Sequence, residues 1–356
     1  MKIDSTLKIK LAKDIGLSLL IYTLPIIAIY LYFRLNNGVI TEAHATIPSW
    51  LQFAKPAFEH LRTWGLTGFL LVLGVIEFGF GLYDNKWTSS ERKVDIVCFL
   101  APKLILPPVI AFFSLKILPA IFPGLENSFA WVPFWLGFFL IAIADDLTQY
   151  WYHRLHHQLP FLWLFHRTHH SAPYMGMAMA SRQNFIYTIL FSQIYLVATL
   201  TYLGLGLPAL FVTVLKSIIT LSAHSSIAWD KPFYKYRILH PAAWVLERFI
   251  STPATHHAHH ADTSGDGVGH FKGNFGNMFF LWDVIFKTAL ITRQFPKTYG
   301  SKSYKQEEWY AQFLWPIFKS KKEGSPLARK VAVVVPTSQN IKVATVNETL
   351  LEQVQS

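Results

Sequence analysis

Residues 131–170 read WVPFWLGFFLIAIADDLTQYWYHRLHHQLPFLWLFHRTHH. The stretch opens with an apolar run, Trp131–Ala144, which passes without a break into Asp145, Asp146 and a set of histidines. Such a run predicts the start of a membrane helix. We therefore expect the histidines to cap the end of a membrane-spanning helix bundle.

The composition supports a membrane protein. Hydrophobic residues make up 52% of the 356 residues, and charged residues make up only 15%. Soluble domains usually carry about 25% charged residues. Aromatic residues reach 16%, which suits a chain with many side chains at membrane interfaces.

The other apolar stretches predict an all-α fold. We expect a polytopic transmembrane bundle of about four to six helices, capped by a cytosolic, histidine-rich helical domain. The bundle would form residues 1–130, the histidine domain residues 131–316, and a flexible tail residues 317–356. The remaining predicted spans are Ile15–Phe33, Gly65–Tyr83 and Val94–Phe122, which prolines would kink. A helical hairpin of Phe185–Leu203 and Pro208–Ala223 is also predicted, and it turns at Gly204, Gly206 and Pro208.

Charge and cysteine content narrow the class of protein further. The formal net charge is +11, and Lys and Arg lie at the ends of the apolar stretches, which predicts that the histidine region faces the cytoplasm. Basic residues do not form a patch interleaved with stacking aromatics, so a nucleic-acid partner is not expected. The single cysteine, Cys98, excludes disulfides and iron–sulfur clusters within the chain.

Histidine spacing carries the functional prediction. Thirteen of the 15 histidines fall between His153 and His270. Residues three and four apart share a helix face, so two imidazoles can bind one metal ion and three can span two ions. All-imidazole ligation suits a transition metal such as iron or zinc. The pattern His-x-x-His-His occurs three times, at His153/His156/His157, His166/His169/His170 and His256/His259/His260.

These boxes resemble those of the fatty acid hydroxylase/sterol desaturase superfamily. The resemblance covers about Leu136 to Leu290. The family's first box, His-x-x-x-His, is matched by His153 and His157, and its second and third boxes are matched in full. The other matching segments are the His224-Ser225 step, Asn274-Phe275-Gly276 and Trp282-Asp283.

The resemblance implies a membrane enzyme, an O2-dependent oxidoreductase that hydroxylates or desaturates a lipid at a di-iron centre. It implies that the two iron ions are held by nine histidines: His153, His157, His166, His169, His170, His224, His256, His259 and His260. The chain has no haem-binding His-Pro-Gly-Gly segment and no cysteine set, so a separate electron donor, either a protein or a small reductant, is expected.

Three further residues are candidates near the metal. His156 is extra to the family's first box and is a candidate ligand. Asp146 precedes His153 by seven residues, two helical turns, so the two can share a face. Metal-bound histidines usually donate their second N–H to a carboxylate or a carbonyl, which makes Asp146 and Asp283 candidates for orienting the ligands. The competing interpretations are a helix exit from lipid for Asp146 and a helix-capping or loop carboxylate for Asp283.

Two other classes of protein remain open. Histidine-rich loops also occur in membrane metal transporters and sensors, although transporters usually place their ligands near the midplane of the membrane. A structural zinc protein would usually use cysteine ligands as well. The clustering of histidines outside the apolar stretches favours the oxygenase.

Overall fold

The computed structural model describes residues 9–21, 66–80, 83, 86–300 and 307–328. These residues form helices, turns and isolated bridge pairs but no β-strand, which confirms the predicted all-α fold. The helices are α3 (Leu66–Gly79), α4 (Ser89–Phe112), α5 (Leu118–Ile121), α6 (Phe134–Gln158), α7 (Pro160–His166), α8 (Met177–Ala180), α9 (Phe185–Ile189), α10 (Ser192–Leu200), α11 (Gly206–His224), α12 (Lys231–Lys235), α13 (His240–Phe249), α14 (Pro253–His259), α15 (Leu281–Ile285) and α16 (Trp309–Leu314).

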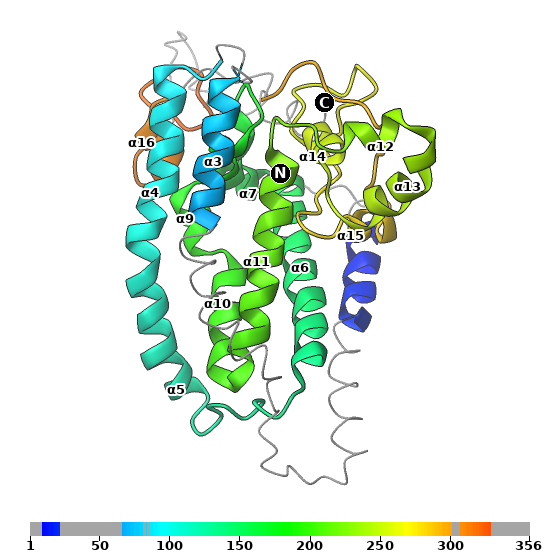
Figure 1. Ribbon diagram of the computed structural model, residues 1–356. Coiled ribbons are helices and arrows are strands. Elements are labelled where there is room, and N and C mark those ends of the chain that lie inside the picture. Colours follow the sequence, from blue (N-terminus) through cyan, green and yellow to red (C-terminus); the bar gives the residue numbers. More distant parts are fainter. Residues whose placement is uncertain (1–8, 22–65, 81–82, 84–85, 301–306, 329–356) are drawn as a thin grey trace.

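The long helices stand side by side and the short ones gather at one end. Figure 1 shows α4, α6, α10 and α11 as a roughly parallel bundle, with α7, α12, α13, α14 and α16 around its upper end. Two helical stretches among the described residues, Ser89–Ile121 and Phe185–His224, are long and apolar enough to cross a membrane. The predicted number of four to six spans stays a prediction.

Helix α4 continues through its prolines. Pro102, Pro107 and Pro108 lie inside it, and a π-helical turn over Phe113–Ile117 joins it to α5. Prolines are tolerated in membrane helices because wider local turns satisfy the backbone groups that they free. The prediction of one helix over this region is therefore confirmed, in the form of a nearly continuous helix from Ser89 to Ile121.

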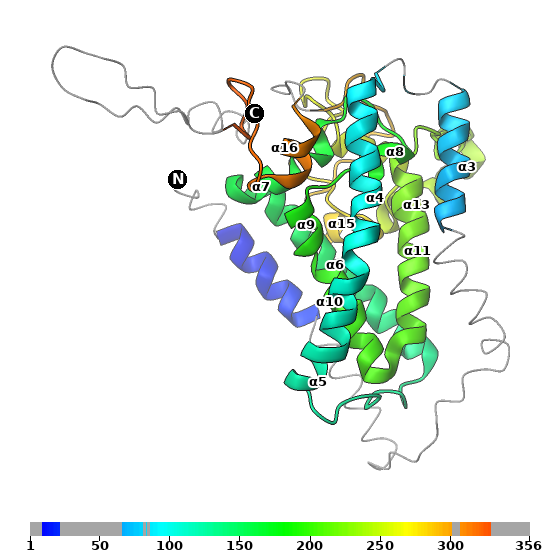
Figure 2. The same ribbon diagram turned by 90° about the vertical axis from the view of Figure 1, so that its left-hand side faces the viewer.

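The stretch Phe185–His224 turns back on itself at Gly204. Its beginning packs at the histidines, where the ring of Tyr187 stacks on His166, and its end carries His224. Its middle lies at the opposite end of the bundle, where the hydroxyl of Tyr202 donates to the carbonyl of Phe122. Gly204 has a φ of +95°, and the predicted helical hairpin is confirmed (Figure 2).

The hairpin packs against α6 to form the core of the bundle. Ile141 and Ala142 of α6 lie in one buried apolar cluster with Leu205, Ala209 and Val212. Helix α6 then continues unbroken through Asp145 and Asp146 to Gln158, as the opening sequence stretch predicts. The core therefore fixes the helix that carries the first histidines.

Both ends of the chain are described in part. Residues 9–21 are helical and pack on α6, where Asp14 pairs with Arg154 at 2.7 Å and Trp151 donates to Ser18. The rest of the predicted span Ile15–Phe33 lies outside the described residues, as do residues 329–356 of the predicted tail.

Residues 317–328, the start of the predicted flexible tail, contact the rest of the chain, and the flexibility of the tail stays a prediction. Leu327 is buried, its carbonyl accepts the N–H of Ser320 at 2.9 Å, and the hydroxyl of Ser325 donates to Glu307. This part of the chain forms a compact turn because it has one apolar anchor and a buried carboxylate to bind. The boundaries at residues 130 and 316 stay predictions.

Candidate metal centre

Helix α6 supplies the first two histidines. His153 and His157 lie one turn apart near its C-terminal end, and side chains four residues apart lie on one face. The helix stops at Gln158 because Leu159 precedes Pro160, and a residue before proline disfavours the helical conformation. Pro160 then begins α7, which brings the second box back toward the first.

The remaining candidate ligands come from four elements. Helix α7 ends at His166, and a 3₁₀ turn over His169–Ser171 presents the other two histidines of the second box. Helix α11 ends at His224. Helix α14 carries the third box and begins with a capping box, in which Thr252 and Thr255 bind each other's backbone N–H groups.

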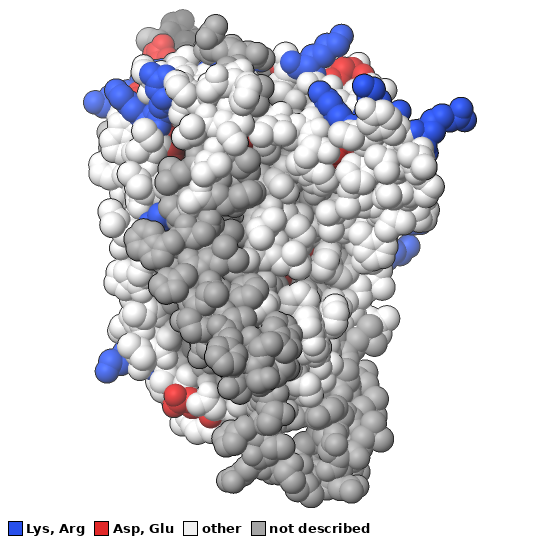
Figure 3. Space-filling model, in the orientation of Figure 1, with Lys and Arg blue, Asp and Glu red and all other residues white. Residues whose placement is uncertain are grey.

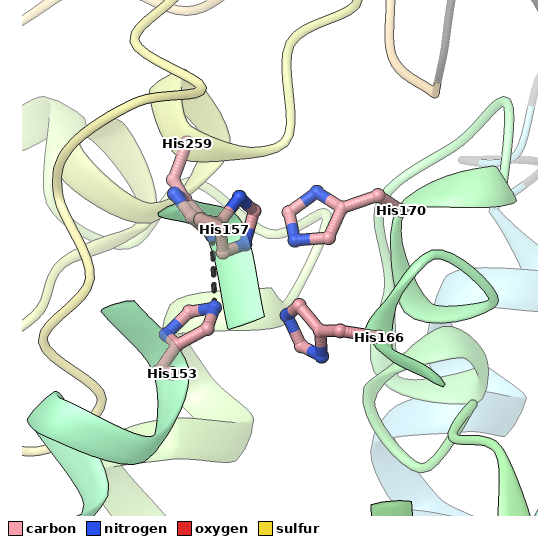
Figure 4. A group of neighbouring side chains, drawn as sticks. All are labelled: His153, His157, His166, His170 and His259. Carbon is pink, nitrogen blue, oxygen red and sulfur yellow. Dashed lines mark hydrogen bonds between the residues drawn. The ribbon is translucent and has the colours of Figure 1, made fainter. Parts of the chain in front are cut away.

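The nine histidines form two buried groups. The ligand nitrogens within each group lie within 4.8 Å of one another. The first group, drawn in Figure 4, surrounds a common centre. It consists of His153, His157, His166, His170 and His259, and the second consists of His169, His224, His256 and His260.

The second and third boxes each contribute to both groups. His166 and His170 join the first group, whereas His169 between them joins the second. The third box is divided in the opposite sense, because His259 joins the first group while its neighbours join the second. The rings of His170 and His260 stack at 4.3 Å between centroids, so the two groups share a wall.

Backbone carbonyls fix the tautomers of three rings. Nδ1 of His153 lies 2.7 Å from the carbonyl oxygen of Phe275, and Nδ1 of His259 lies 2.7 Å from that of Gly273. Nδ1 of His224 lies 2.7 Å from the carbonyl of Thr220. A carbonyl can only accept, so each Nδ1 carries the hydrogen and each Nε2 directs a lone pair into its group.

These lone pairs face one another. Nε2 of His153 and Nε2 of His259 are 3.0 Å apart, the pair joined by a dashed line in Figure 4. Neither atom can donate while its ring is neutral with Nδ1 protonated, so a shared cation is needed. Two nitrogen ligands at about 2.1 Å from one ion and at right angles lie about 3 Å apart. The separation fits a metal ion better than a hydrogen bond.

The second group repeats this spacing. Nε2 of His224 lies 2.9 Å from Nε2 of His256 and 3.3 Å from Nε2 of His169. Nε2 of His260 lies 3.2 Å from Nε2 of His256. Each group therefore presents a set of close, buried nitrogen atoms of the kind that one transition-metal ion binds.

Burial keeps the imidazole rings of the second and third boxes in their neutral form. Desolvation, followed by the neighbouring histidines, lowers the pKa of His166, His170, His259 and His260 well below 6.5. Within the described part of the chain, neither ring nitrogen of His157, His166 or His170 has a hydrogen-bond partner. Buried polar atoms without partners are costly, and metal ligation would satisfy one nitrogen of each ring. The residues present thus fit a bound metal.

Other histidines near the boxes lie outside both groups. Nδ1 of His156, the extra candidate ligand, bonds to the carbonyl of Tyr152, and its ring packs between Tyr152 and Tyr187. His240 and His270 bond to the carbonyls of Tyr234 and Thr288. We find no role for these three as ligands among the described residues.

Asp146 and Asp283 were expected to contact the histidine rings directly, but both carboxylates bind other groups. Asp146 accepts from the N–H of Phe279 at 2.8 Å and from the indole of Trp282 at 3.0 Å. Asp283 accepts from the N–H groups of Phe275 and Gly276 at 2.9 and 2.6 Å. Nδ1 of His153 is bonded to the carbonyl of Phe275, so neither carboxylate binds that ring directly. Instead, both carboxylates hold the loop that carries this carbonyl.

Glu77 is a residue near the site that sequence reasoning did not assign. Its carboxylate is fully buried. It accepts from the hydroxyl of Ser225 at 2.7 Å and from the N–H of Ser226 at 2.8 Å. These serines directly follow His224. An ionisable residue in an apolar helix is a signal for such a role, but the helix is about 150 residues away in sequence.

A family model confirms the resemblance. The model described as fatty acid hydroxylase matches residues 138–288. Residues 138–288 belong to the fatty acid hydroxylase family. This fatty acid hydroxylase region contains all nine grouped histidines and both carboxylates. The family implies an oxidoreductase that acts in lipid oxidation and is associated with a membrane. Comparison with the curated proteins and with the solved structures gives no match to the chain.

Proposed function

We propose that this protein is a membrane-bound, non-haem di-iron oxidoreductase that uses O2 to hydroxylate or desaturate a lipid. The observation that carries the proposal is the pair of buried histidine groups, of five and four rings, inside the fatty acid hydroxylase region. Each group offers only nitrogen ligands, which suit iron. One ion in each group gives the di-iron centre.

The side chains have distinct tasks in this proposal. The nine histidines hold the two ions through nitrogens that face each group's centre, and the carbonyls of Phe275, Gly273 and Thr220 keep three of the rings in orientation. Activation of O2 for attack on an unactivated C–H bond is the chemistry that two bound iron ions would supply. No side chain is assigned as a general base.

Aromatic rings keep water away from the first group. Trp163 packs 5.2 Å from the ring of His157 and 5.5 Å from that of His170. Phe271 and Phe275 contact His157 at 4.9 and 5.4 Å. Exclusion of water prevents side reactions of reactive oxidants, so this apolar wall suits oxidation of a C–H bond.

The distribution of charge on the surface supports a membrane protein; a lipid substrate and four to six spans are part of the proposal. In Figure 3 most of the visible Lys and Arg side chains lie at the end that carries the histidines, and a broad uncharged flank lies below them. By the positive-inside rule this end faces the cytoplasm. A lipid held along the apolar bundle would extend toward the histidine groups, where a separate donor could deliver electrons.

The position of the ligands argues against a metal transporter. Both groups lie beyond Asp145 and Asp146, where the apolar run of α6 ends. A transported ion is usually bound near the midplane by interrupted helices. Here the long helices α6 and α11 carry their grouped histidines only in their C-terminal turns, away from the middle of the bundle.

Lipid mass spectrometry tests the proposal. Cells expressing the parent chain and cells expressing His170→Ala are compared in a host that supplies electron donors, and iron is counted in both purified proteins. We expect a lipid that gains one oxygen, or loses two hydrogens, only with the parent chain. We also expect about two iron ions per parent chain, one for each group.

His240→Ala is the matched control, because His240 lies outside both groups. It should retain both the lipid change and the iron. The proposal is wrong if the purified parent chain binds no iron after reconstitution, or if His170→Ala oxidises the lipid as well as the parent does.

A further inference from the structure

Helix α13 directs its apolar face away from the protein. Trp244, Val245 and Phe249 are 55%, 49% and 52% exposed. The opposite face contains Glu247, which is buried and forms a two-pronged ion pair with Arg293 at 2.8 and 2.9 Å. A soluble surface helix has the reverse arrangement, with its polar face outward. An outward apolar face marks contact with a membrane or a partner.

Contacts join the end of α13 to the part of α6 where its apolar stretch gives way to Asp145 and Asp146. Ile250, directly after α13, pairs with Phe279 in an isolated bridge. Phe279 packs against the cluster that contains Ile141, and its N–H donates to Asp146. Asp146 follows the apolar part of α6. Figure 1 shows α13 at the outer edge of the upper end of the molecule.

The length of α4 places the membrane surface at the same end. The stretch Ser89–Ile121 has 33 residues, which at about 1.5 Å per residue is about 50 Å. The hydrocarbon core is only about 30 Å thick, so the helix must project from it. Four of the six charged residues of this stretch, Glu91, Arg92, Lys93 and Asp95, lie in its first two turns, at the end near the histidines.

Basic residues are frequent in α13 and in the segment that precedes it. Between Lys231 and Phe249 the sequence has four basic residues and one acidic residue, the paired Glu247. Lys231 and Lys235 line an open groove with Tyr234, Tyr236 and Phe295. Basic residues beside an outward face of Trp, Val and Phe are typical of interfacial helices that bind anionic lipids.

We propose that α13 lies in the membrane interface, with its apolar face among acyl chains and the neighbouring basic side chains on the phosphates of anionic phospholipids. This inference rests on the membrane association in the proposed function. Only Ile250–Thr252 separate α13 from α14, which carries the third histidine box. The anchor would therefore hold that box at a fixed height above the bilayer.

Site-directed spin labelling tests the depth of α13. The chain's single cysteine, Cys98, is buried, so an introduced exposed cysteine can be labelled selectively. A nitroxide is placed by Val245→Cys in the full chain, reconstituted in nanodiscs of phosphatidylcholine and phosphatidylglycerol. Leu104→Cys, on the exposed face of α4, is the lipid control, and Ser264→Cys, in an exposed loop, is the water control.

Relaxation by O2 and by a water-soluble nickel chelate gives the depth of each label. We expect the label at 245 to favour O2, as the label at 104 does, whereas the label at 264 favours the nickel chelate. If the label at 245 favours the nickel chelate, as the label at 264 does, while the label at 104 favours O2, this inference is wrong. The proposed function as a membrane enzyme is then unaffected. A label at 104 in water overturns both.

Quenching tests the choice of lipid. A fluorophore at 245 is exposed to brominated phosphatidylglycerol or to brominated phosphatidylcholine at equal mole fractions. We expect stronger quenching by the anionic lipid, and equal quenching once Lys235→Gln and Arg237→Gln are introduced. The charge-matched control is Lys319→Gln with Lys321→Gln, next to α16 on the opposite side of the molecule, and it should keep the preference (Figure 1). Equal quenching in the parent chain refutes binding of anionic headgroups.

Discussion

Glu77 is the residue that joins three separate segments around the second histidine group. Besides the two serines after His224, its carboxylate accepts from the hydroxyl of Tyr83 at 2.5 Å and from the N–H of Met177 at 2.8 Å. All four partners are donors, so an ionised carboxylate satisfies them and no other side chain of that size would. The residue orients the end of α11 without touching a ligand nitrogen.

Glu77→Gln should therefore weaken the fold and the second group together. The amide would turn a donor toward donors, and the loss of charged hydrogen bonds costs about 1 to 3 kcal/mol of unfolding free energy. Iron content and thermal unfolding of the purified protein check this expectation. Glu126→Gln, at the far end of the bundle, is the control. Unchanged iron content in Glu77→Gln would show that the carboxylate has no part in placing His224.

At the scale of elements, the hairpin of α10 and α11 decides where His224 lies. The chain reverses at Gly204, whose φ of +95° is a conformation that favours glycine. A Cβ at this position would lie 2.9 Å from the backbone nitrogen of Ala130, so the loop before α6 closes directly over the turn. The reversal returns α11 to the histidine end and buries its apolar face against α6.

Gly204→Ala should destabilise the hairpin by more than about 1 kcal/mol, because both the backbone conformation and the space exclude a methyl group. Gly16→Ala is the matched control. Gly16 lies in the exposed helix 9–21 with no atom within 4 Å of an added Cβ, so alanine there should be neutral or mildly stabilising. Thermal unfolding in detergent distinguishes the two variants. Equal unfolding midpoints would contradict the strain assigned to Gly204.

At the scale of the whole molecule, the two histidine groups hold the upper end of the bundle together. Helices α6, α7, α11 and α14 and the 3₁₀ turn after α7 all end in or pass through them. Without metal, the groups consist of buried neutral rings whose nitrogens have few partners. Metal binding should therefore contribute to the stability of the fold.

Chelation should lower the unfolding temperature of the purified protein. A ligand present at about 1,000 times its dissociation constant stabilises the state that binds it by about 4 kcal/mol. Thermal unfolding before and after removal of iron measures the effect. A chain that carries both His170→Ala and His260→Ala, one change in each group, should show little further loss on chelation. An unfolding midpoint that chelation leaves unchanged in the parent chain would contradict a structural role for the metal.

Acid should destabilise the metal-free protein. The pKa values of His166, His170 and His260 are lowered well below 6.5, so these rings stay neutral in the fold and are protonated only on unfolding. The unfolded chain then binds more protons, and stability that is present above pH 6.5 is lost as the pH falls below it. The slope is at most about 1.4 kcal/mol per pH unit for each ring. Thermal unfolding of chelated protein over this range checks the sign, and stability that rises on acidification would refute it.

The sequence alone determined the helical class, the hairpin, the course of α6 into the first box and eight of the nine grouped histidines. These features are local: apolar runs of sufficient length form helices in lipid, and residues three or four apart share a helix face. The family pattern added His224, which no spacing rule connects to the boxes. The compact turn at residues 317–328 was missed because its apolar content is small.

Only the tertiary structure decided how the histidines divide and what orients them. The split of the second and third boxes between two groups depends on how α6, α11 and α14 meet. The carbonyl of Phe275 is 122 residues from His153, and Glu77 is 148 residues from Ser225. Backbone carbonyls have no side-chain identity that a sequence could display, and contacts over such separations arise from packing between elements. For that physical reason the spacing of histidines predicted which of them lie together but not the arrangement that holds them.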